Sequence, residues 1–166
     1  NKKEGKGKLV YPNGNGSYVG EFQNNMFNGA GIETLQDESY KKVSEGVFVN
    51  SILFDGEKTL YLSSGKKQIY EIKGAKPVSI NQYNNGILEF SEKGEFFPNN
   101  SLNTGTQKQF IDNYIITTNF KNGTEVSRTT NIDNYYVPSD IIGDSESISL
   151  ELIFEKNDQT KYINIY

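Results

Sequence analysis

Residues 14–31, with the sequence GNGSYVGEFQNNMFNGAG, restrict the possible fold more than any other stretch of the chain. Tyr18, Gly20 and Phe22 stand at alternate positions, and alternate residues of a β-strand share one face. The missing side chain of Gly20 leaves a slot between two rings, which a side chain from a neighbouring hairpin can fill. Asn25 tolerates a positive φ and marks the expected reversal of the chain. The stretch therefore predicts an aromatic β-hairpin.

The glycine pattern recurs along the chain. The G-x-G of residues 5–7 returns at residues 29–31, and an offset of about 24 residues indicates an internal repeat. A less complete third copy covers residues 44–58, where Ser51 takes the turn position of Asn25. The extra length of this copy is assigned to a polar loop over residues 36–42. The glycines at structural positions of the repeat are Gly5, Gly7, Gly20, Gly29, Gly31, Gly46 and Gly56.

The order G-x-G, a turn, Y-x-G-x-F, a second turn and N-G-x-G resembles the MORN repeat (membrane occupation and recognition nexus). Residues 5–31 match this pattern well and residues 44–58 match it in part. Residues 61–66 and 83–90 resemble the divergent variants found in bacterial proteins, including antitoxin-like ones. The resemblance implies a scaffolding module that binds protein, or, as the family name implies, a module that binds phospholipid at a membrane surface.

The later part of the chain departs from the repeat. Residues 91–96 are expected to form a further turn, and residues 97–109 form the longest candidate loop. Two strands, 110–118 and 124–130, are predicted to pair through a turn at 121–123. An acidic connector over 134–146 then leads to two final strands, 147–154 and 162–166, which are expected to cap the sheet because solenoids need a covered end.

These observations predict an all-β fold. We expect an elongated meander of MORN-like β-hairpins that forms an open, twisted sheet with a non-repeat β cap at the C-terminal end. The predicted division is residues 1–97 for the MORN-like hairpin repeats and residues 98–166 for divergent hairpins and the cap, continuous with the first part. The many Phe and Tyr residues and the scarcity of Leu and Ala fit short strands joined by turns.

Composition excludes several kinds of chemistry. The chain has neither Cys nor His, so it lacks thiolate ligands, Cys nucleophiles and the commonest general base. Its formal net charge of -4 argues against nucleic acid as the main partner. The lysines at 2, 3, 6, 8, 66 and 67 are assigned to solvated strand edges. No apolar run is long enough to span a membrane, and the location stays open between the cytoplasm and an exported or cell-envelope site reached after leader removal.

Paired carboxylates are the one catalytic device that the composition permits. The candidate sets are Glu89, Glu92 and Glu95, or Asp140, Asp144 and Glu146. Such a pair would act on carbohydrate, as in glycosidases, but solvated polar faces are the favoured interpretation. The sequence therefore assigns no catalytic, cofactor-binding or metal-binding residue, and no cofactor is expected.

The aromatic residues have two interpretations. Stacking between repeats is favoured, and an exposed stripe that binds a partner is the alternative; its candidate residues are Tyr11, Tyr18, Phe22, Phe48 and Tyr61. An unpaired sheet edge also offers a site for strand addition by a partner. We therefore expect a non-catalytic module for protein–protein interaction or scaffolding, with phospholipid binding as the second hypothesis and a carbohydrate-acting enzyme as the third.

Overall fold

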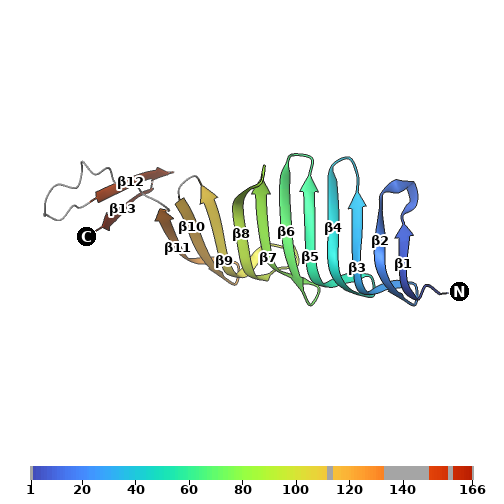
Figure 1. The fold of residues 1–166 in the computed structure, drawn as a ribbon. Helices are drawn as coiled ribbons and strands as arrows, with labels where there is room; N and C mark the ends of the chain where they lie inside the picture. The colour runs from blue at the N-terminus through green and yellow to red at the C-terminus, as the bar shows by residue number, and fades with distance from the viewer. Residues whose placement is uncertain (1, 112–113, 133–149, 157–158, 166) are drawn as a thin grey trace, which may run out of the picture. The chain divides into compact units, whose positions relative to one another are not determined.

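The chain folds as β-sheet throughout its described part. The computed structural model describes residues 2–111, 114–132, 150–156 and 159–165. The chain divides into two compact units, residues 1–133 and 134–166. The first unit is one sheet of eleven antiparallel strands arranged in chain order, β1 to β11 (Figure 1). Because each strand pairs only with its sequence neighbours, the sheet is open, and the predicted all-β meander is confirmed.

The strands are joined by short connections, one of which contains the 3₁₀ turn η1 (Pro12–Gly14). The strands of the first unit are β1 (Gly5–Val10), β2 (Gly16–Gln23), β3 (Met26–Gln36), β4 (Tyr40–Val49), β5 (Ile52–Leu62), β6 (Lys66–Lys73), β7 (Lys76–Asn84), β8 (Ile87–Phe96), β9 (Leu102–Ile111), β10 (Tyr114–Lys121) and β11 (Thr124–Ile132). The second unit holds an antiparallel pair, β12 (Leu150–Lys156) and β13 (Gln159–Ile165).

Asparagine-rich turns reverse the chain at one end of the hairpins. Asn24 and Asn25 have φ values of 51° and 70°, and Asn50 and Ser51 have φ values of 49° and 66°. Positive φ at both central residues suits the twist of the flanking strands, so the predicted turn roles of Asn25 and Ser51 are confirmed. Each turn also bonds to the preceding hairpin: the Asn25 N–H donates to the Lys3 carbonyl (3.2 Å), and the Ser51 N–H donates to the Phe27 carbonyl (2.9 Å).

Glycines form a row in register across the first five strands. The paired residues are Gly7, Gly20, Gly31, Gly46 and Gly56. A Cβ atom on Gly46, whose φ is +150°, would lie 2.7 Å from the Gly56 Cα and would also strike the Asp55 carbonyl oxygen. Only glycine permits two backbones to approach this closely.

The glycine row stops at β6, where Ile72 faces Gly56, and a further cross-strand pair appears at Gly94 and Gly105. These two glycines have the same strained φ and the same close approach as the Gly46 pair. The predicted turn at residues 91–96 is therefore wrong, since this stretch lies inside β8. The repeat geometry returns there with Phe96 at the position of Phe22 but with Glu92 in place of Tyr18.

An aromatic cluster fills one face of β2 to β4. Tyr18 and Phe48 are 0% and 1% exposed, and the cluster also contains Phe22 and Phe27. The Tyr18 ring stacks on the Phe27 ring with centroids 3.7 Å apart, and the other rings meet edge to face. The sequence predicted that a side chain from a neighbouring hairpin fills the slot at the glycines. This prediction is wrong, because the ring of Tyr18 itself covers Gly31.

Two predicted loops are shorter than expected. Strand β3 continues to Gln36 and β4 begins at Tyr40, so only residues 37–39 connect them instead of residues 36–42. Strand β9 begins at Leu102, which reduces the predicted loop 97–109 to residues 97–101. The polar side chains of these stretches led to the prediction of loops. Strands in an open sheet also accept polar side chains on their solvated faces.

The C-terminal predictions have mixed outcomes. The turn at residues 121–123 does join two strands, although Phe110 belongs to β9 rather than to the outgoing strand of that hairpin. Strands β12 and β13 overlap the two predicted final strands, and their capping role stays a prediction. The acidic connector 134–146 lies outside the described residues. The proposed boundary at residue 97 falls between the paired strands β8 and β9, and the division itself stays a prediction.

Candidate functional site

The sheet of the first unit has two chemically different faces. We call the face that carries Tyr18 and Phe48 the inner face, and the opposite one the outer face. One row of paired residues crosses the inner face from β2 to β11: Tyr18, Glu33, Ser44, Lys58, Tyr70, Ile80, Glu92, Gln107, Thr118 and Arg128. Ser44, Glu92 and Thr118 are buried in it, each on the first strand of its hairpin, as Tyr18 is. The inner face therefore changes from aromatic to polar along the chain.

Two charged residues of this row are desolvated. The Lys58 ammonium lies 3.9 Å from the centroid of the Tyr70 ring, and burial, with a smaller contribution from Lys42, lowers the pKa of Lys58. Burial raises the pKa of the Glu92 carboxyl, although the Gln107 Nε2 donates a hydrogen bond to it (2.9 Å). Charges placed this way cost stability unless the charged form gains a partner.

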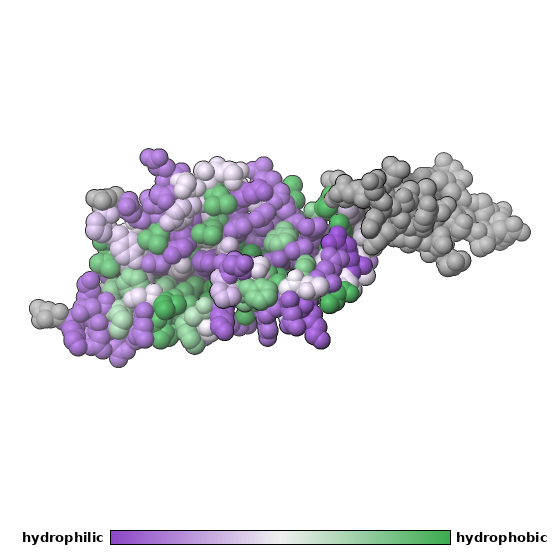
Figure 2. Space-filling view, turned by 180° about the vertical axis from the view of Figure 1, so that it is seen from behind, coloured by the Kyte–Doolittle hydropathy of each residue, from purple (hydrophilic) through white to green (hydrophobic). Residues whose placement is uncertain are grey.

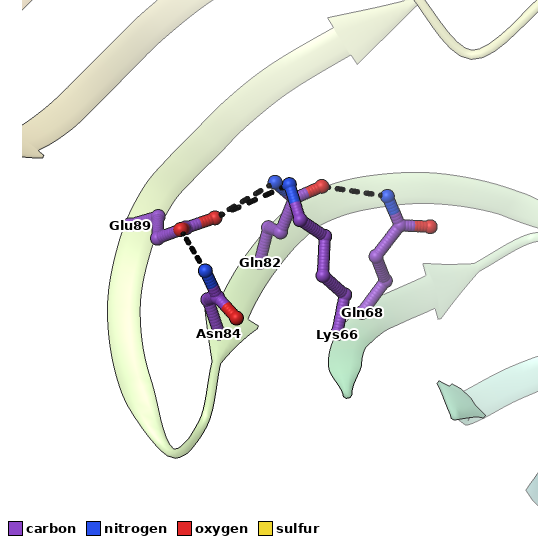
Figure 3. Close-up of polar contacts among 5 residues, drawn as sticks. All are labelled: Lys66, Gln68, Gln82, Asn84 and Glu89. Carbon is purple, nitrogen blue, oxygen red and sulfur yellow. Dashed lines mark hydrogen bonds and ion pairs between the residues drawn. The ribbon is translucent and has the colours of Figure 1, made fainter. Parts of the chain in front are cut away.

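A polar network joins β6, β7 and β8 on the same face (Figure 3). Asn84 Nδ2 and Gln82 Nε2 donate to the two Glu89 carboxylate oxygens at 2.7 and 3.2 Å, and the Lys66 ammonium lies 3.7 Å away. Gln68 Nε2 donates to Gln82 Oε1 (2.9 Å). The hydrogen bonds from Asn84 and Gln82, helped by Lys66, lower the pKa of Glu89. These residues satisfy one another, which is what a structural network requires.

The structure around this network bears on two predictions from the sequence, the strand-edge position of the lysines and the pairing of carboxylates. Lys66 and Lys67 lie on β6, between β5 and β7, so their assignment to a strand edge is wrong. The hydrogen bonds tie Glu89 to Asn84 and Gln82, and Glu92 to Gln107, so amides rather than a second carboxylate hold each of them.

The other candidate acids add little to a catalytic site. Glu95 is exposed on β8, and the alternative set, Asp140, Asp144 and Glu146, lies outside the described residues. Among the side chains that the structure does describe, no three acidic groups gather as they would around a metal ion.

Glu92 and Glu89 are expected to respond to pH in opposite directions. Because the folded pKa of Glu92 is raised, its ionisation weakens the fold as pH rises from the ordinary value of 4.5. Because the folded pKa of Glu89 is lowered, its contribution is full above 4.5 and is lost as pH falls. Thermal melting of Glu92→Gln should therefore give a gain of about 2 °C at pH 7, and melting of Glu89→Gln should give a loss. Both differences should shrink toward about pH 4.

Glu95→Gln is the matched control for this pair, since Glu95 is exposed on the same strand. Its melting temperature should stay close to that of the wild type at pH 7, because exposed surface substitutions change stability little. A lowered melting temperature for Glu92→Gln at pH 7 would contradict the desolvation of the Glu92 carboxylate.

The outer face of β1 to β4 holds an open hollow of about 770 Å³. Its apolar lining comes from Val19, Ala30, Ile32 and Val47, and its charged lining from Lys6, Glu21 and Glu45. Val19 faces Ile32 across β2 and β3, and Ala30 faces Val47 across β3 and β4. Val19, Ile32 and Val47 are 50%, 42% and 45% exposed. This hollow is a contiguous apolar surface with charges of both signs beside it.

Hydrophobic residues are unevenly distributed over the sheet. In Figure 2 they gather over the N-terminal hairpins on the face displayed, whereas hydrophilic residues dominate elsewhere. Exposed apolar patches on a folded chain commonly mark interaction sites.

The repeat pattern, the glycine row and the aromatic hairpins can be compared with known families. The MORN repeat family model matches residues 1–16 and 18–40. This part of the chain consists of MORN repeats. The resemblance seen in the sequence is confirmed over these residues, and no curated protein matches the chain.

MORN repeats are generally non-catalytic modules for binding or membrane association, through protein or lipid contacts. In the described part of this chain, no helix combines the length and apolar character needed to cross a bilayer. The family thus gives the class of function without naming a partner.

The five aromatic residues proposed as partner contacts lie mostly inside the fold. Tyr18, Phe22 and Phe48 are buried in the aromatic cluster, which agrees with the favoured stacking interpretation. The half-buried Tyr11 hydroxyl donates to Glu33 Oε1 (2.7 Å), and burial together with this bond raises the pKa of Tyr11. Only Tyr61, 45% exposed, offers a large surface. Partner contact by any of the five stays a prediction.

Sequence reasoning missed the hollow because it followed the aromatic residues. The signal was present at Val19 and Val47, which alternate with Tyr18 and Phe48 and so must occupy the opposite face. Aliphatic residues at those positions predict an apolar outer face.

Proposed function

We propose that this chain is a non-catalytic module that binds a protein partner through the hollow on the outer face of β1 to β4. The exposed valines and isoleucine of this hollow carry the proposal. The inner face supports this proposal indirectly, since the side chains of the aromatic cluster and of the Glu89 network contact one another within the fold. The outer hollow is therefore an apolar surface whose side chains stay exposed, as binding surfaces commonly are.

The chemistry of the hollow favours protein over a lipid surface. Its charged lining combines Lys6 with Glu21 and Glu45, and the whole chain is acidic, with a formal net charge of -4. Anionic lipids select clusters of Lys and Arg, which this lining lacks. A protein surface with an apolar centre and a mixed polar rim matches it better.

A capture experiment with matched variants tests the proposal. The full chain, its Val47→Asp variant and its Val126→Asp variant are immobilised and exposed to extract from the source organism. Val47 lines the hollow, whereas Val126 is 59% exposed on β11, away from it. A carboxylate in the hollow should reduce capture of the partner at least about tenfold, which corresponds to about 1.4 kcal/mol, and Val126→Asp should capture it like the wild type.

Two results would contradict this proposal. Equal capture by the two variants would show that the hollow is not the binding surface, provided that both melt like the wild type. Co-sedimentation of the chain with phosphatidylserine vesicles at physiological salt would favour the phospholipid hypothesis.

A further inference from the structure

The outer hollow continues into a row of acidic side chains. One cross-strand row of paired residues runs over the outer face from β2 to β6: Val19, Ile32, Glu45, Glu57 and Glu71. Val19, Ile32 and Glu45 line the hollow, and all three glutamates are exposed. The row therefore changes from aliphatic to anionic at β4.

A second row beside the first shows the same change. Ala30 on β3 faces Val47 on β4, and Val47 faces Asp55 on β5. Ala30 and Val47 line the hollow, and Asp55 is exposed. Two neighbouring rows of the outer face thus have aliphatic side chains toward β2 and β3 and carboxylates from β4 or β5 onward.

The glutamates of the first row have few partners within the fold. The Lys73 ammonium lies 3.0 Å from a Glu71 carboxylate oxygen, and the Thr59 hydroxyl donates to Glu57 Oε1 (3.0 Å). Within the part of the chain that the structure describes, neither Glu45 nor Glu57 belongs to an ion pair. Like charges directly opposite one another on neighbouring strands are unfavourable. The row therefore does not stabilise the sheet, whereas a cationic segment laid over it would be attracted.

The exposure of this row does not arise at an end of the sheet. Strands β4, β5 and β6 are each paired on both sides, so the row lies on a continuous sheet face. Residues 134–166 are acidic on balance, and Lys156 and Lys161 are their only basic residues. That part of the chain is therefore a poor electrostatic match for the row.

We propose that the partner segment bound in the hollow has aliphatic residues followed by several Lys or Arg residues. Its aliphatic part lies over β2 to β4, and its basic part lies beside the glutamate row on β4 to β6. This inference rests on the function proposed above and adds the chemistry and the direction of the bound segment. Apolar burial supplies affinity in such an interface, and charge complementarity supplies specificity and a fast association rate.

A phage-displayed library of random peptides is the probe, because it assumes nothing about the sequence of the partner. The full chain is immobilised, and the peptides are long enough to cover the roughly 19 Å from β2 to β6. The enriched peptides should combine aliphatic residues with an excess of Lys and Arg. Selection on the double variant Glu45→Lys, Glu57→Lys should instead enrich peptides with an excess of Asp and Glu.

Synthetic copies of the enriched peptides measure the two halves of the surface separately. Val47→Asp should weaken their binding at least about tenfold through the hollow, and the double variant Glu45→Gln, Glu57→Gln should weaken it about tenfold through the lost charges. Glu95→Gln is the matched control, since Glu95 is an exposed glutamate on β8, outside both rows. It should leave the affinity unchanged.

The direction of the segment is tested with a nitroxide label on the peptide. A label at the basic end should broaden the amide NMR signals of Glu57 and Glu71 more than those of Val19 and Ile32. A label at the aliphatic end should do the opposite. The reverse order of broadening would overturn the proposed direction.

The remaining outcomes separate this inference from the proposed function. Peptides that depend on Val47 but show no excess of Lys and Arg would overturn the inference and leave the hollow as the binding surface. So would peptides that bind the double variant Glu45→Gln, Glu57→Gln as tightly as the wild type. Failure to enrich any peptide, or binding unaffected by Val47→Asp, would contradict the hollow itself and the inference with it.

Discussion

Replacing Gly46 with alanine is expected to destabilise the eleven-stranded sheet by about 3 kcal/mol. Part of this loss is backbone strain of about 1–3 kcal/mol, because Gly46 has a φ of +150° that side chains rarely permit. The rest is overpacking, since the new Cβ would lie 2.7 Å from the Gly56 Cα and against the Asp55 carbonyl. Backbone atoms of a paired strand cannot rotate aside as a side chain can. Urea unfolding followed by far-ultraviolet circular dichroism measures the effect.

Gly7→Ala is the matched control, since Gly7 lies in the same glycine row, on the first described strand of the sheet. The nearest atom to its added Cβ would be a Phe22 ring carbon at 3.4 Å, an ordinary contact distance. The change in unfolding free energy should stay below about 1 kcal/mol. The main contribution to it is the lower conformational entropy of the unfolded chain when alanine replaces glycine. Similar losses for the two variants would contradict the close backbone approach at Gly46.

Local rules of strand and turn predicted the N-terminal hairpins well. Tyr18, Gly20 and Phe22 share a face, and Asn25 and Ser51 hold positive φ, because alternation and turn conformation are properties of a few neighbouring residues. The Gly94–Gly105 pair escaped the same reasoning. Its strand carries Glu92 where the first repeat carries Tyr18, so only Phe96, at the position of Phe22, kept the aromatic pattern.

The surface properties could be predicted only in part. Which side of a strand is buried depends on what the other strands place upon it, and this is a tertiary effect. Tyr18 is fully buried, whereas its neighbour Val19 is 50% exposed. A hypothesis of partner binding through aromatic residues assumes the opposite, an exposed Tyr18. The Glu89 network could not be predicted either, because its members come from three strands whose register the sequence alone does not give.

Replacing Tyr18 with alanine is expected to cost about 3–5 kcal/mol, the range for a fully buried aromatic residue. Tyr18 is 0% exposed, and its ring meets Phe22, Phe27 and Phe48. Tyr18→Phe should cost only about 1 kcal/mol, because it removes the single hydrogen bond from the Tyr18 hydroxyl to the Glu21 carbonyl (3.1 Å) and keeps the ring contacts. The same urea titration gives both values.

Tyr61→Ala separates packing from partner binding. Tyr61 is 45% exposed on β5, so its removal should change the unfolding free energy by less than about 1 kcal/mol. If Tyr18→Ala proved as mild as Tyr61→Ala, the stacked cluster would not hold the hairpins together, and Tyr18 would return as a candidate partner contact. If Tyr18→Ala is the more destabilising of the two variants, as expected, a loss of binding in a Tyr18 variant reflects a damaged sheet. Only variants at exposed positions such as Tyr61 or Val47 then report on the partner surface itself.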